Sequence, residues 1–276
     1  MEMQEYVSQN ATFERLNQLG YRIVDYSGIE VVVPPLCAVP AGPFLMGSDP
    51  RRDSSAWSIE LPQHEVVTGA FHIAKYPLTV AEYSCAVRQR AVRAATSSWG
   101  EPWAQWEAQL GNPTYPVVNL RWEDGVGYAA WLSSVTGEHW RLPTEAEWEK
   151  AARGVDGLIY PWGDQFDASF ANTDESQLGR ITPIDAYPEG ASPYGVMDMI
   201  GNVIERCSSI WRPYPYLSDD GREALEDVTE WRISRGGSYM DTANNARAAT
   251  RWPLPREQVG GPHGCRLLLE VCRTLT

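Results

Sequence analysis

The alternation of apolar and polar positions predicts many short elements and few long ones. Residues 12–19 have the pattern of a short amphipathic helix, and residues 21–33 predict a small pair of strands. Residues 38–47 predict a further strand, and residues 64–75 predict one strand with a bulge at Gly69. None of these segments is long enough to form a core by itself.

Two helices carry clear boundary signals. Residues 122–136 begin with acidic side chains and are followed by Gly137, which is typical of a helix end. In the segment 144–153, Thr144 and Glu147 have the spacing of a capping box, in which each side chain bonds the other's backbone. Both segments are therefore predicted to be helical.

The C-terminal third is expected to be mostly irregular. Residues 155–234 show little periodicity, and the pair Gly236-Gly237 then allows a sharp turn that other residues could not make. Arg247 and Arg251 follow in a segment too rich in Asn, Thr and Pro to be a good helix. We expect these two guanidinium groups to be buried and to bond loop carbonyls.

Composition narrows the class of protein. The 276 residues are 43% hydrophobic, with 12 Trp and 13 Tyr, so a sizeable core is available. A net charge of −13 without a basic run disfavours nucleic acid and anionic membranes as partners. No apolar run approaches the ~20 residues of a membrane span, and residues 1–10 do not resemble a secretory signal. Five cysteines without a CxxC pair indicate the reduced thiols of a cytoplasmic protein.

Several phrases together resemble the formylglycine-generating, sulfatase-modifying family. They include VPAGPFLMGS (39–48), RLPTEAEWEKAARG (141–154), GVMDMIGNVIE (195–205), RGGSY (235–239) and GCR (264–266). The resemblance covers roughly residues 38–271. It implies an α+β, C-type-lectin-like fold with little regular secondary structure over 38–276, on which residues 1–37 pack as an N-terminal extension.

The resemblance also bears on catalysis. Enzymes of this family oxidise a target cysteine with a copper ion held by two cysteines after the RGGS phrase. Those two positions fall on Asp241 and Ala246, and a carboxylate beside a methyl group cannot replace the thiolate pair that selects Cu(I). We therefore expect no copper and no catalytic residues of that kind. The four scattered histidines offer no alternative site of the three-His type found in related sulfoxide synthases.

The stretch RGGSYMDTANNARAATR is also very like the variable region of proteins diversified by retroelements, another branch of this fold. The resemblance implies an outward-facing, ligand-binding set of residues. That set is Tyr239, Asp241, Thr242, Thr250, Trp252, Gln258, Gly260 and His263. Tyr, Trp, Asn and Thr are residue types that binding surfaces favour. Met240, Trp252 and Leu254 are not readily reached by adenine changes from an Asn codon, so an inactive family member with a fixed loop is the alternative interpretation.

A structural calcium ion is implied by the same family. The resemblance assigns it to the side chains of Asp198 and Glu205 and the carbonyls of Gly201 and Val203, which are the hard oxygen ligands that calcium prefers. A second calcium would use Asn172 and the carbonyl of Thr173.

The sequence thus predicts a non-catalytic domain that binds a ligand, a protein by preference, through its C-terminal loops. The alternatives are a divergent oxidoreductase of the same family and a regulatory accessory domain of an effector system.

Overall fold

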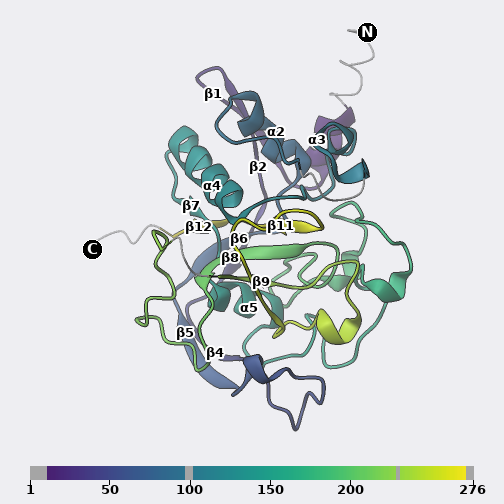
Figure 1. Ribbon diagram of the computed structural model, residues 1–276. Coiled ribbons are helices and arrows are strands. Elements are labelled where there is room, and N and C mark those ends of the chain that lie inside the picture. The colour runs from purple at the N-terminus through teal and green to yellow at the C-terminus, as the bar shows by residue number, and fades with distance from the viewer. Residues whose placement is uncertain (1–10, 97–101, 228–230, 272–276) are drawn as a thin grey trace.

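The computed structural model describes residues 11–96, 102–227 and 231–271 (Figure 1). Within these residues the chain forms two sheets of four strands and two of two strands, joined by long irregular segments. Helices are few, and α4 is the longest of those with complete bounds. This is the α+β architecture with little regular secondary structure that the sequence predicts.

The N-terminal part forms a helix across residues 11–18 and then a hairpin, as predicted. Strand β1 (Arg22–Tyr26) pairs antiparallel with β2 (Ile29–Val33). Leu16 from the helix and Val32 from the hairpin are buried in one apolar cluster with residues of the main body. The N-terminal segment therefore contributes to a shared core.

A second sheet has the order β3-β6-β12-β7, and all its strand pairs are antiparallel. Its members are β3 (Leu36–Val39), β6 (Phe71–Ala74), β7 (Trp140–Arg141) and β12 (Leu268–Glu270). Strand β4 (Gly42–Met46) pairs separately with β5 (His64–Thr68). The prediction of one bulged strand over 64–75 is wrong, because the chain changes sheets near Gly69 and continues from β5 into β6.

The central sheet has the order β10-β9-β8-β11. Its strands are β8 (Ile204–Ile210), β9 (Arg232–Arg235), β10 (Arg251–Leu254) and β11 (His263–Cys265), and β11 runs parallel to β8. Every residue of β8 is buried. Because four of its seven residues are charged or polar, the apolar pattern did not predict this strand.

The two helices predicted over residues 122–136 and 144–153 are both present. Helix α2 (Val80–Arg88) has a capping box of Thr79 and Glu82, and α5 (Glu145–Arg153) has one of Thr144 and Glu147. Helix α4 spans Trp122–Thr136 and ends at Gly137, whose φ of 74° is left-handed. A short helix α3 (Trp106–Gln109) lies between α2 and α4. The single-turn 3₁₀ helices are Ser58–Glu60, Pro102–Ala104, Asp174–Ser176, Pro188–Gly190 and Ala243–Asn245.

Helix α5 lies beneath the central sheet, and α2 and α4 lie on the other side (Figure 1). The ring of Trp148 on α5 is completely buried in a cluster that includes Ile73, Met199 and Ala246. Its indole N–H donates to the carboxylate of Glu205 on β8 at 2.7 Å. In the described part of the chain, no helix is long and apolar enough to cross a membrane.

Candidate ligand-binding site

Two glycines turn the chain from β9 into the loop that follows. Gly236 and Gly237 have φ values of 88° and 65°, which side chains with a Cβ rarely adopt. A Cβ on Gly236 would also lie 2.9 Å from the carbonyl oxygen of Met199, and one on Gly237 would lie 3.0 Å from the Cβ of Ala246. The turn therefore requires glycine at both positions.

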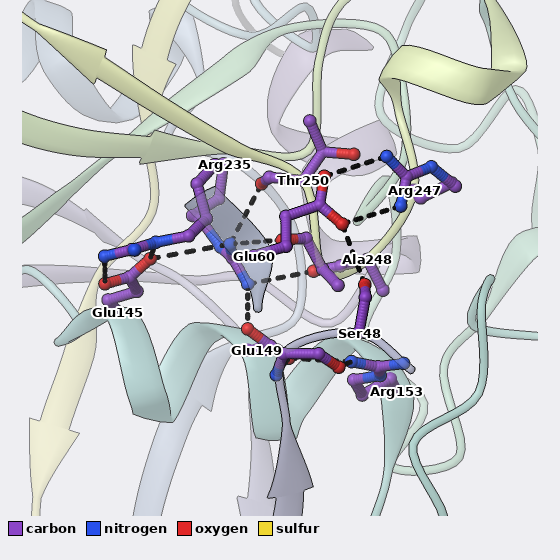
Figure 2. A network of polar contacts seen from close by, with 12 residues as sticks. Ser48, Glu60, Glu145, Glu149, Arg153, Arg235, Arg247, Ala248 and Thr250 are labelled. Atoms are coloured by element: carbon purple, nitrogen blue, oxygen red, sulfur yellow. Dashed lines mark hydrogen bonds and ion pairs between the residues drawn. The ribbon is translucent and has the colours of Figure 1, made fainter. Parts of the chain in front are cut away.

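Arg247 fixes the middle of this loop, and Figure 2 shows its guanidinium facing the carboxylate of Glu60. Its Nη1 and Nη2 donate to the two carboxylate oxygens of Glu60, each at 2.8 Å, and Nη1 also donates to Asp53 at 2.6 Å. Its Nε donates to the carbonyl of Asn244 at 2.7 Å. The guanidinium is buried, as expected, but it binds two acids as well as a carbonyl.

Arg235 and Arg251 hold the two strands beside the loop. Arg251 donates to both oxygens of Glu145, at 2.6 and 2.9 Å. Arg235 pairs with Glu149 and donates to the carbonyls of Ala249 and Thr250, both at 2.9 Å (Figure 2). Burial acts to raise the pKa of Glu149, but the charges of Arg235 and Arg153 outweigh it, so that pKa is lowered. The irregular backbone thus rests on buried ion pairs.

Asp241 and Ala246 occupy the positions at which the resemblance places the two copper-binding cysteines, and both make other contacts here. The carboxylate of Asp241 accepts hydrogen bonds from the backbone N–H and the hydroxyl of Ser238, at 2.9 and 2.8 Å. Ala246 is completely buried and packs in the cluster around Trp148. Neither residue offers a soft metal ligand at this place.

An open hollow of about 610 Å³ lies beside this loop. Its walls come from three separate segments of the chain: Trp103, Asp174, Leu178, Gly179, Arg180, Tyr239 and Met240. The rings of Trp103 and Tyr239 meet edge to face, with 6.2 Å between their centres. Trp103 and Arg180 also border a narrower pocket of about 140 Å³, lined further by Val80, Tyr115 and Ile181.

The walls of the hollow are tied to one another. The N–H of Asp174 donates to the carbonyl of Asp241 at 3.0 Å, and Glu175 accepts from the N–H of Ala243 at 2.9 Å. Met240 is 63% exposed and Leu178 46% exposed, and both line the same hollow, so their apolar surfaces lie together. Arg180 is exposed as well, and its guanidinium has no ion-pair partner among the residues that the structure describes. The hollow therefore presents apolar surface and one cation on a fixed backbone.

Only part of the predicted outward set lies at this hollow. Tyr239 lines it, but with 8% exposure this side chain is buried and not outward-facing as predicted. Thr242 is exposed on the same loop. Thr250 and His263 are buried, so their prediction as outward residues is wrong. Thr250 directly precedes β10, and its carbonyl accepts from Arg235. His263 belongs to β11, where burial and the charge of Arg206 lower its pKa to about 3.

The remaining predicted residues lie away from the hollow. Trp252 is half-buried on β10 and packs edge to face on Trp57, with 4.9 Å between ring centres. Gln258 is exposed on the loop before β11, and its carbonyl accepts from Arg206 at 2.8 Å. Gly260 lies two residues further along, partly exposed. None of the three lines the hollow.

The predicted calcium ligands are already engaged with protein groups. Both oxygens of Glu205 accept from Arg266 at 2.6 Å, so this carboxylate would have to leave its guanidinium to bind a metal. Asp198 is buried and accepts from Asn202 at 2.9 Å. Burial raises the pKa of Asp198 to about 7, and the nearby charge of Glu205 adds to the rise. Val203 and Gly201 are buried beside it, and calcium binding there stays a prediction.

The second predicted calcium site is also closed by hydrogen bonds. The side-chain oxygen of Asn172 accepts from the Ser176 hydroxyl at 2.9 Å, and the carbonyl of Thr173 accepts from the Ser176 N–H at 2.9 Å. Across residues 11–96, 102–227 and 231–271, no cluster of three or more His, Cys, Asp or Glu side chains is arranged to hold a metal ion.

The sequence did not single out Trp103, Leu178 and Arg180, which complete the hollow. Trp103 lies in a segment with weak periodicity, and the other two lie in a loop without any local signal. The density of Trp residues in 91–114 was the one hint, because large aromatic side chains are enriched at binding surfaces.

The fold and the loops around the hollow define a C-type-lectin-like domain. The chain belongs to the family described as the sulfatase-modifying factor enzyme 1-like domain, whose model matches residues 29–271. This confirms the family and the fold that the sequence predicts.

Two relatives illustrate the range of this family. The inactive C-alpha-formylglycine-generating enzyme 2 of Mus musculus is 29% identical over 269 residues, covering 79% of this chain and 80% of that protein. The serine/threonine-protein kinase pkn1 of Chlamydia caviae is 32% identical over 244 residues, covering 83% of this chain and 37% of the kinase. This chain thus spans little more than a third of the kinase's length.

Two solved structures share the fold. PvdO from Pseudomonas aeruginosa superimposes with a TM-score of 0.76 at 26% identity, covering 91% of this chain and 98% of PvdO. The Treponema denticola variable protein 1 superimposes with a TM-score of 0.68 at 17% identity, covering 90% of this chain and 98% of that protein. The second likeness concerns the fold alone.

Proposed function

We propose that this chain is a non-catalytic domain that binds a ligand, a protein by preference, in the hollow beside Tyr239. The observation that carries the proposal is the hollow itself, where exposed Met240 and Leu178 and the exposed Arg180 sit on loops that buried ion pairs hold in place. A preformed surface of this kind loses little entropy on binding. The family resemblance supports it, since an inactive enzyme is among the relatives.

The absence of catalysis is part of the same proposal. Asp241 and Ala246 stand at the copper positions, and Ser238 engages the Asp241 carboxylate. We further propose that a retroelement has varied this loop. A near-copy of residues 235–266, with Asn codons at the varied positions, is then expected beside a reverse-transcriptase gene.

Site-specific photo-crosslinking tests the binding proposal. A photoreactive amino acid is placed at Met240, in the hollow, and in a second variant at Val67, which is 70% exposed on β5 and not part of the hollow. We expect a discrete adduct in cells from position 240 and none from position 67. Replacing Arg180 by Glu in the first variant should weaken the adduct. Equal adducts from both positions, or none from position 240, would contradict the proposal.

A structural calcium ion is a further proposal, supported by the buried Asp198, whose carboxylate has a hydrogen bond to Asn202 but no cation of its own among the described residues. Its role would be to fix the 198–205 segment, and a chelation experiment tests it below.

A further inference from the structure

A second cavity, of about 330 Å³, lies on the α4 side of the molecule. It shares no lining residue with the hollow beside Tyr239. Carbon dominates its walls, which are Val126, Ala129, Ala130, Trp140, Leu142 and Leu225. Four residues with polar groups complete the lining: Arg141, Thr144, Ser208 and Glu223. A few polar groups in an apolar cavity of this size are typical of small-molecule sites.

Glu223 is the acid of this cavity, and its hydrogen bonds come from neutral hydroxyl groups. Its Oε1 accepts from Ser209 at 2.6 Å and from Tyr216 at 2.7 Å, and its Oε2 accepts from Ser208 at 3.2 Å. No lysine, arginine or histidine in the described ranges forms an ion pair with it. Glu223 is half-buried, and a carboxylate with restricted access to water normally has a cationic partner, which this one lacks among the described residues.

The charged groups around Glu223 do not supply that cation. The Arg141 guanidinium borders the cavity, but it donates its hydrogen bonds to the carboxylates of Glu147 and Glu270. Arg232 interacts electrostatically with Glu223, but its guanidinium donates its hydrogen bonds to the carbonyls of Ser208, Ala224 and Asp227. Burial raises the pKa of Glu223, and the negative charge of Glu145 raises it further.

We propose that this cavity is a site for a small hydrophobic ammonium compound, meaning a protonated amine on a compact apolar group. The ammonium would replace the missing cation at Glu223, and the apolar group would lie against Trp140 and Leu142. Charge complementarity favours this class of ligand over an organic anion, which would face Glu223 directly. Charge complementarity also favours an ammonium compound over a neutral apolar molecule, because the neutral molecule would leave the carboxylate without a cation.

The test compares benzylamine with benzyl alcohol, which has a similar shape and no charge, by isothermal titration calorimetry at neutral pH. We expect the wild-type protein to bind the amine at least about tenfold more tightly than the alcohol. Glu223→Gln keeps an oxygen for the hydroxyl donors but removes the charge, so both molecules should then bind with similar affinity. Equal affinities in the wild-type protein, or a preference for the amine that persists in Glu223→Gln, would overturn the proposal.

A second variant tests whether the amine binds in this cavity. Ala130 is exposed at the border of the cavity, so Ala130→Trp should obstruct it without disturbing the core. We expect this variant to melt like the wild-type protein and to bind neither molecule. Amine binding that survives in Ala130→Trp would place the site elsewhere. In the wild-type protein, amine affinity should rise with pH as Glu223 ionises, while binding of the alcohol should not.

Discussion

The guanidinium of Arg247 binds both oxygens of the Glu60 carboxylate, although 187 positions separate the two residues in the chain. The contact joins a single-turn helix near the N-terminus to the loop that follows the RGGS strand end. Ser48 donates to the same carboxylate at 2.7 Å. The irregular loop is therefore fixed by a partner from the opposite end of the sequence.

Arg247→Met should destabilise the fold strongly. The substitution leaves the carboxylates of Glu60 and Asp53 without their cation, and breaking a buried pair from one side costs about 3–5 kcal/mol. Arg180→Met is the matched control, because that guanidinium is exposed, and we expect a change within about 0.5 kcal/mol. Chemical denaturation measures both. Similar losses in the two variants would mean that the buried pairs contribute little.

Thr250→Val should stabilise the protein. The Thr250 side chain is completely buried, and its hydroxyl has no hydrogen-bond partner among the described residues. Removing an unsatisfied hydroxyl while keeping the shape should add about 1 kcal/mol to the free energy of unfolding. Thr144→Val is the control, because it removes the α5 cap and should cost about 1 kcal/mol. A loss of stability in Thr250→Val would show that an ordered water satisfies the hydroxyl.

The stability difference between Glu82→Gln and the wild-type protein should depend on pH. Burial raises the pKa of Glu82 to about 7, so the folded state holds this proton more tightly than the unfolded state does. This contribution is present at low pH and is lost as pH rises from about 4.5 through 7. Gln keeps the capping acceptor without ionising, so the variant should gain about 2 kcal/mol relative to wild type between pH 5 and 8. Denaturation at both pH values measures this difference, and a difference that does not change with pH would contradict the prediction.

Removal of calcium should lower the melting temperature if the proposed site at Asp198 is occupied. An ion that binds only the folded state stabilises it by mass action. Asp198→Ala should abolish the response to a chelator, whereas Asp219→Ala, at an exposed position, should retain it. Identical melting curves with and without chelator, together with no calcium by elemental analysis, would rule the site out.

The protein should not oxidise a cysteine-containing peptide in the presence of copper. Asp241 and Ala246 provide no thiolate, and the Asp241 carboxylate is engaged by Ser238. Mass spectrometry of the peptide after incubation with the protein and Cu(I) measures the outcome. Conversion of cysteine to formylglycine would show that another group holds the metal.

The elements that could be predicted are those with local signals. The capping box of α5 lies within four consecutive residues, so the sequence shows it directly. Strand β8 could not be predicted, because its polar residues are buried by distant partners. Glu205 is neutralised by Arg266, and Arg206 donates to the carbonyls of Pro255 and Gln258. A pattern of apolar positions cannot reveal a strand whose buried charges are paired across the fold.

The residues of the candidate site also fall into those that the sequence could indicate and those that it could not. The RGGS resemblance led to Tyr239, which does line the hollow. The predictions for Thr250 and His263 were wrong because position in a motif does not reveal which side chains the rest of the fold covers. Trp103 and Arg180 reach the hollow only through the course of long loops, for which no local rule exists.

The RGGS loop is held in place by its two glycines and by buried arginines, not by the side chains at its surface. Arg235 holds it through the carbonyls of Ala248, Ala249 and Thr250, which every amino acid possesses. Such anchoring does not depend on which side chains stand at the rim. A lineage carrying this domain can therefore exchange Met240 or Thr242 one substitution at a time without passing through an unfolded ancestor.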